Sequence, residues 1–176
     1  MNCDPNRLSL ENAFSQGAEI SGENLIINIS GAIAVHGTVC SGNNIRFDNM
    51  TLTFENFRLV SAFILTRRVL DFKSNSPKEI KGRKLYKSEI EDFTQRFVTE
   101  EWDIMSFEFS DKKGECKAAG KIAISLVFSS NGDMFTVNIS CDNLTAEAMG
   151  EGEIIPKAKI SFLKKFSKIF KGKNSR

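Results

Sequence analysis

The chain has 176 residues, a formal net charge of +2 and a hydrophobic fraction of 41%. This length predicts a single domain whose core is large enough to form without disulfides or a structural metal. Its purely apolar runs span only a few residues, which excludes a helix that crosses a bilayer, and its N-terminus lacks a signal-peptide pattern. We therefore expect a cytoplasmic protein.

The first predicted element is a short helix that begins near Asp4-Pro5. Aspartate is a preferred N-cap, and proline suits the first helical position. Leu10 and Phe14 would then share one face of the helix. The alternative is an extended segment in which Leu8 and Leu10 alternate with polar residues.

Strands are predicted after this segment. Apolar side chains recur at every second position from Leu25 to Ile29, which is the period of a half-buried strand. Gly31 is a candidate β-bulge. Further strands are predicted at residues 33–39, 45–47, 50–54 and 59–65.

Residues 73–87 form a basic segment that contains Ser76-Pro77 and Gly82, so we predict a loop. Its candidate role is to bind the phosphate groups of nucleic acid or lipid. A solvated loop without that role is favoured, because no nucleic-acid-binding motif accompanies the charges. The candidate residues of this secondary basic loop are Lys78, Lys81, Arg83, Lys84 and Lys87.

One helix is predicted at residues 88–99. Ser88 and Glu91 have the spacing of a capping box. Ile90, Phe93 and Phe97 follow at helical spacing and form an apolar stripe. We expect this helix to cover the apolar face of a sheet.

The strongest pattern is a β-hairpin centred on Asn131-Gly132, the preferred pair for a type I′ turn. Folding the chain there places Phe128 opposite Phe135 on a wholly apolar face. The opposite face is mostly polar, which predicts an antiparallel sheet with one buried side. The same register pairs Leu126 with Val137, Ile124 with Ile139 and Ile122 with Cys141.

These elements, with a further strand in which Met105, Phe107 and Phe109 alternate with polar residues, predict an α+β fold. We expect a mainly antiparallel β-sheet, either a sandwich or a half-barrel, with the 88–99 helix against it. Residues 31–44 align without gaps on residues 120–133. This alignment suggests an internal duplication with halves at about 20–72 and 109–155, although shared strand-turn-strand composition is the slightly favoured explanation.

The distribution of charge is the one functional hint. Residues 157–176 hold eight basic residues and no acidic one, whereas residues 1–156 hold six more acidic than basic residues. We therefore divide the chain into a β-rich domain, 1–156, and a basic C-terminal amphipathic helix, 157–176. The candidate binding residues of this helix are Phe162, Leu163, Phe166, Ile169 and Phe170 on the apolar stripe and Lys164, Lys165, Lys168 and Lys171 on the basic face.

Three interpretations of this helix compete. It lies on an anionic membrane surface, it enters the groove of a protein partner, or it packs on its own domain. The predicted function is a non-enzymatic interaction module, peripheral at a membrane or bound to a protein. The alternative is a carrier of an apolar small molecule or lipid in a pocket between sheet and helix. Nucleic acid is a less favoured partner.

Catalytic and metal-binding patterns are weak. His36 is the only histidine, and the four cysteines form no Cys-x-x-Cys pair, so we predict neither a zinc site nor a cofactor. Glu100, Glu101 and Asp103 are candidates for acid–base chemistry, but they follow a helix end and suit surface charge. No phosphate-binding or hydrolase motif is present, which makes an enzyme the least favoured class.

Overall fold

The computed structural model describes residues 1–35, 43–71, 76–109 and 121–155. These residues form two antiparallel sheets, a short 3-10 helix η1 (Pro5–Arg7) and the α-helix α1 (Lys87–Thr99). The predicted antiparallel α+β architecture is therefore confirmed. The predicted C-terminal helix lies outside the described residues.

The large sheet contains ten strands: β1 (Asn2–Cys3), β3 (Ala13–Ser21), β4 (Asn24–Ser30), β7 (Met50–Glu55), β8 (Arg58–Asp71), β9 (Ser76–Lys84), β10 (Trp102–Phe109), β11 (Ile122–Ser130), β12 (Asp133–Cys141) and β13 (Asn143–Ala148). Their order across the sheet is β1-β13-β7-β4-β3-β10-β11-β12-β8-β9. The small sheet has the order β14-β6-β5-β2, with β14 (Glu153–Ile155), β6 (Asn44–Phe47), β5 (Ala32–Ala34) and β2 (Leu8–Ser9).

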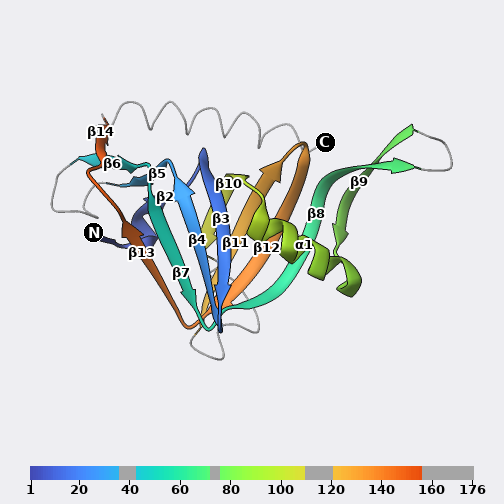
Figure 1. Cartoon of the computed structure of the whole chain (residues 1–176), viewed down its shortest axis with the longest axis horizontal. Coiled ribbons are helices and arrows are strands. Elements are labelled where there is room, and N and C mark those ends of the chain that lie inside the picture. The colour runs from blue at the N-terminus through green and yellow to red at the C-terminus, as the bar shows by residue number, and fades with distance from the viewer. Residues whose placement is uncertain (36–42, 72–75, 110–120, 156–176) are drawn as a thin grey trace.

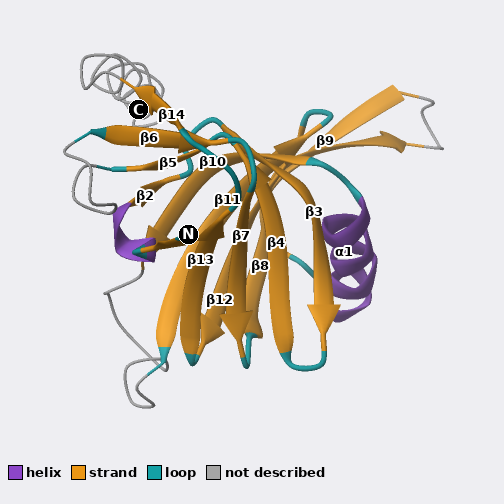
Figure 2. Ribbon diagram, turned by 60° about the vertical axis from the view of Figure 1, so that its left-hand side comes forward, coloured by secondary structure: helices purple, strands orange, loops and turns teal. Residues whose placement is uncertain are grey.

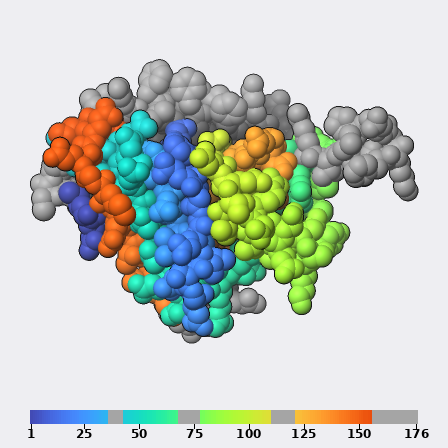
Figure 3. Space-filling model, viewed as in Figure 1, coloured from blue at the N-terminus to red at the C-terminus, as the bar shows by residue number. Residues whose placement is uncertain are grey.

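The large sheet is strongly bent. In Figure 1, β13, β7 and β4 on one side and β12 and β8 on the other converge at one end and splay apart at the other. The small sheet lies near the splayed end, while α1 stands beside β3 (Figure 2). One continuous cluster of buried apolar side chains joins both sheets and the helix. The space-filling view shows α1 and β10 in yellow-green packed against blue β3 (Figure 3).

The hairpin prediction is confirmed in its register. Phe128 pairs with Phe135, and both side chains are at most 1% exposed. The other three predicted apolar pairs also face each other. Asn131 and Gly132 have φ values of 51° and 85°, as the type I′ turn requires.

The predicted covering helix is also confirmed. Phe93 and Phe97 of α1 are buried, and their rings lie 5.0 Å from Phe135 and 4.9 Å from Phe128, measured between centroids. Phe93 also contacts the ring of Trp102 at 6.4 Å. Aromatic contacts of this kind contribute to stability beyond the buried area, so this cluster fixes α1 on the sheet.

The N-terminal helix prediction was wrong beyond its first turn. Asp4 caps η1 by accepting a hydrogen bond from the Asn6 N–H at 3.0 Å, as expected of this residue pair. The chain then enters β2 and β3, so the extended alternative is correct. Leu10 and Ala13 reach the core from strand-like segments, because tertiary pairing overrides a weak local helix signal.

The predicted basic loop is instead largely a strand. Residues 76–84 form β9, which pairs with β8 at the edge of the large sheet. Pro77 is tolerated there because an edge strand leaves one side of its backbone unpaired. In Figure 1 the β8–β9 hairpin projects away from the body.

Two local predictions need correction. Met105 does not share a face with Phe107 and Phe109, because a register shift between β10 and β11 at this position turns its side chain outward, where it is 51% exposed. The N-cap of α1 is Tyr86, rather than Ser88. The internal duplication stays a prediction: residues 32–34 belong to the small sheet and residues 122–130 to the large one, while residues 36–42 lie outside the described residues.

Candidate binding groove

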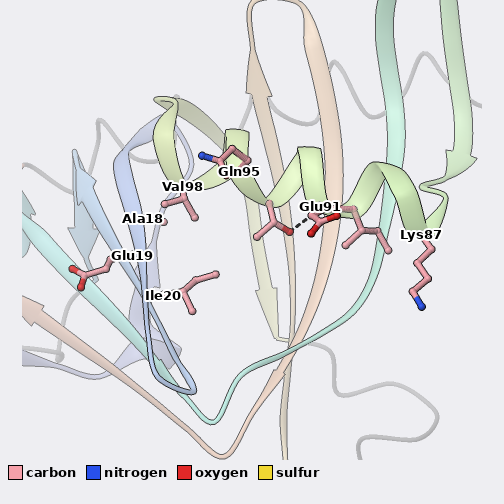
Figure 4. Close-up of a pocket in the computed structure, with 9 residues that line it drawn as sticks. Ala18, Glu19, Ile20, Lys87, Glu91, Gln95 and Val98 are labelled. Carbon is pink, nitrogen blue, oxygen red and sulfur yellow. Dashed lines mark hydrogen bonds between the residues drawn. The ribbon is translucent and has the colours of Figure 1, made fainter.

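A groove of about 870 Å³ lies between the C-terminal half of β3 and α1. Figure 4 shows Ala18 and Ile20 on the strand side and Gln95 and Val98 on the helix side. Ile20 is 42% exposed, so the groove presents an apolar side chain to solvent. The lining residues are Ala18, Glu19 and Ile20 from β3 and Lys87, Ile90, Glu91, Thr94, Gln95 and Val98 from α1.

The groove exists because β3 leaves β10. Only Ala13, Phe14 and Ser15 of β3 pair with β10, whereas the pairing of β3 with β4 continues to Ser21. A register shift against β4 follows Ser15. Residues 18–20 of β3 therefore have α1, rather than another strand, at their side.

Gly17 lies where α1 approaches β3. Its φ of +119° is a conformation that favours glycine, whereas space is not the constraint, because a β-carbon at this position would lie at an ordinary contact distance of 3.6 Å from the Val98 carbonyl oxygen. The Ser15 hydroxyl also accepts a hydrogen bond from the Gly17 N–H at 3.3 Å. This corner fixes the end of the groove where strand and helix meet.

The first turn of α1 is fixed by an ion pair to β9. Both guanidinium NH groups of Arg83 donate to Glu89 at 2.7 Å, and Glu89 also accepts from the Tyr86 N–H at 2.8 Å. The pKa of Glu89 is lowered to about 2, and the hydrogen bonds from Arg83 are the largest cause. Glu89 therefore stays ionised at neutral pH and satisfies a free N–H at the helix start.

The last turn of α1 is fixed by a second ion-pair network. Arg96 donates from Nε to Glu100 at 2.8 Å and from a terminal nitrogen to Asp133 of β12 at 3.1 Å. Its guanidinium lies 5.3 Å from the centre of the Trp102 ring. Arg67 of β8 approaches the same Asp133 carboxylate at 3.6 Å. Both ends of the helical wall are thus held by charged contacts.

The secondary basic residues lie on β9 and at the start of α1. Lys78, Lys84 and Lys87 are exposed, and Lys81 forms an ion pair with Glu79 at 2.9 Å. Arg83 is engaged by Glu89, so its role in the described structure is to hold the helix. Only Lys87 of this set lines the groove.

Other candidate residues are not brought into one site. The C-terminal binding residues 162–171 and His36 lie outside the described residues. Glu100 is bound by Arg96, while Glu101 and Asp103 are exposed. The acidic residues after the helix therefore make ion pairs or face solvent, as the sequence suggested for surface charge.

The described cysteines are poor nucleophiles. Cys3 and Cys141 are free and buried. Burial is the main cause that raises the pKa of both thiols, to about 11 for Cys141. Across the described ranges no group of histidine, cysteine, aspartate and glutamate side chains is arranged to hold a metal ion.

Comparisons of the chain with protein-family models, curated proteins and solved structures give no match. Among the residues that the structure describes, no helix is long and apolar enough to cross a membrane. The sequence analysis placed its alternative carrier pocket between sheet and helix, but it did not identify the residues of this groove, since the two walls come from residues 18–20 and 87–98. No local sequence pattern marked Ile20 as a groove residue, because its 42% exposure is a property of the folded structure.

Proposed function

We propose that this protein is a non-enzymatic interaction module that binds an apolar segment of a partner in the groove between β3 and α1. The observation that supports the proposal is the groove itself, with Ile20, Ile90 and Val98 on its walls. Concave sites with apolar walls and a few polar groups are the usual form of binding sites. The charged side chains of Lys87 and Glu91 supply those polar groups.

The groove favours a partner segment over an enclosed small molecule. Its walls are one strand and one helix, and several lining side chains, including Ile20, Lys87 and Glu91, are exposed. The buried apolar residues behind it form a continuous core. The alternative function, in which the same groove carries an apolar small molecule or lipid, is therefore tested second.

The test uses the apolar dye anilinonaphthalene sulfonate and the full-length protein. We expect dye fluorescence to rise on binding and the Ile20→Ser variant to bind at least about threefold more weakly, because an apolar contact is lost. Val60→Ser is the matched control, since Val60 is also an exposed strand residue, at 46%, but does not line the groove. Equal dye binding by the wild type and both variants would contradict the proposal.

A second candidate function rests on the charge asymmetry of the chain. The excess of basic residues in 157–176 over an acidic body supports contact with an anionic membrane surface, where each lysine contributes about 1 kcal/mol. The exposed lysines of β9 would add to the same attraction. Vesicle flotation distinguishes this candidate from groove binding.

A further inference from the structure

We propose that the occupant of the groove is an extended peptide that pairs with the free edge of β3 as an additional antiparallel strand. This inference rests on the proposed function and names the class of partner that the groove receives. The peptide would carry apolar side chains at every second position and a basic side chain between them. Strand addition to an open sheet edge is an established mode of peptide recognition.

The register of the β3–β4 hairpin shows which backbone groups are free. Ser21 pairs with Asn24 across the two-residue turn Gly22-Glu23, so these two residues exchange hydrogen bonds. Hydrogen-bonded and non-hydrogen-bonded pairs alternate along an antiparallel ladder. Ala18 and Ile20 therefore belong to non-hydrogen-bonded pairs, and their N–H and C=O groups point away from β4.

No strand occupies that outer edge in the part of the chain that the structure describes. The pairing of β10 with β3 ends at Ser15, and among the described residues no backbone hydrogen bond to Ala18 or Ile20 comes from a loop or from α1. Two residues thus offer two donors and two acceptors at the spacing of a strand. A peptide in extended conformation satisfies all of them at once.

The edge of β3 is less protected against strand pairing than the terminal strand β9. β9 carries exposed Lys78, Lys81 and Lys84, and Pro77 removes one donor. Charged side chains and proline are the usual devices that prevent unwanted strand pairing. The corresponding part of β3, Ala18-Glu19-Ile20-Ser21, has one charged side chain, Glu19, and no proline.

The two faces of β3 determine which side chains we expect at each position of the bound peptide. Figure 4 shows Ile20 directed toward the groove and Glu19 directed away from it. Side chains of an added strand that lie opposite Ala18 and Ile20 would point to the same face, toward Ile90 and Val98. The intervening residue would lie beside exposed Glu19, where a lysine or arginine gives an opposite-charge pair.

The experiment begins with selection of a random heptapeptide display library on the full-length protein. An enriched peptide is synthesised with a fluorescent label, and its dissociation constant is measured by anisotropy for wild type, Ile20→Pro and Ile20→Ala. Proline removes an outward N–H that takes no part in the β4 ladder, whereas alanine keeps it. We expect the proline variant to bind about tenfold more weakly than the alanine variant.

A second measurement does not depend on the folding of any variant. The peptide is N-methylated at one amide at a time, and each version is tested on the wild-type protein. Strand addition predicts that alternate methylations abolish binding while those between them are tolerated. If N-methylation weakens binding equally at every amide, strand addition is overturned. It is also overturned if the library yields no peptide that prefers the wild-type protein over an Ile20→Pro variant whose circular dichroism spectrum is native.

The outcomes separate this inference from the proposed function. If dye binding depends on Ile20 but peptide binding is insensitive to methylation, the apolar groove remains as the binding site and strand pairing is excluded. Preferential binding of a fatty acid that displaces the dye, with no peptide enriched, identifies a lipid carrier and also overturns strand addition. Dye binding that is insensitive to Ile20→Ser removes both proposals.

Discussion

Arg83 and Glu89 form a two-point ion pair, with both nitrogen–oxygen distances at 2.7 Å, that joins the edge strand β9 to the first turn of α1. The guanidinium also lies 4.6 Å from the centre of the Tyr86 ring. Bidentate arginine–carboxylate pairs fix orientation as well as distance. The position of the helical wall of the groove therefore depends on a contact with β9.

The Glu89→Gln variant is expected to lower the free energy of unfolding by about 1 kcal/mol at pH 7, because it weakens both the ion pair and the cap. The pKa of Glu89 is about 2 in the folded protein against an unperturbed value of 4.5. A lowered pKa stabilises the fold above 4.5, and this contribution is lost as the pH falls from 4.5 towards 2. The stability difference between wild type and variant should shrink across that window.

Urea denaturation at several pH values between 7 and 2 measures this difference, and Glu91→Gln is the matched control. Glu91 lies on the same helix and is exposed. Its substitution should change stability by less than about 0.5 kcal/mol. A Glu89→Gln difference that stays constant down to the lowest pH would show that ionisation of Glu89 does not stabilise the fold.

Arg96 should be more important than its place near the surface suggests. Arg96→Met is expected to lower stability by about 2 kcal/mol, because Glu100 and the mostly buried Asp133 lose a shared cation. Arg96→Lys should lower it by about 1 kcal/mol, since lysine keeps the charge but not the planar fork. Denaturation followed by the fluorescence of Trp102, the only tryptophan, measures both effects.

Arg58→Met is the control for this comparison. Arg58 is an exposed arginine on β8, so its loss should change stability by less than about 0.5 kcal/mol. Equal destabilisation by Arg58→Met and Arg96→Met would mean that the network around Asp133 adds nothing specific.

The features that the sequence predicted well are local. Asn131-Gly132 specifies its own turn, and the alternation on either side then fixes the Phe128–Phe135 register. The apolar stripe of residues 90–97 likewise specifies a covering helix. In each case the residues that carry the signal are the residues that form the element.

The features that the sequence did not predict depend on distant partners. The bulge that exposes Met105 is set by pairing with β11, and β9 becomes a strand because β8 extends to residue 71. The groove depends on where β3 separates from β10, which no local pattern records. Glu89 caps α1 because Arg83 holds it, although Ser88 and Glu91 had the capping spacing.

The turn of the β11–β12 hairpin gives a test free of packing effects. Gly132 has a φ of +85°, and a β-carbon added to it would meet no atom within 4 Å, so substitution strains only the backbone. Gly132→Ala should lower the free energy of unfolding by about 1 kcal/mol. Gly132→Asn should cost less, since asparagine tolerates positive φ. Thermal denaturation that ranks alanine above asparagine in stability would contradict the type I′ assignment.

The membrane hypothesis for residues 157–176 predicts flotation with anionic vesicles. Full-length protein should float with vesicles that contain phosphatidylserine, and a version ending at Pro156 should not, because it lacks eight basic residues. Vesicles of phosphatidylcholine alone are the lipid control, and binding should fall as salt rises, since screening weakens the attraction of exposed charges. Flotation of the shortened protein would instead assign the contact to the lysines of β9. Equal, negligible flotation of both proteins removes the membrane hypothesis and leaves the groove as the binding surface.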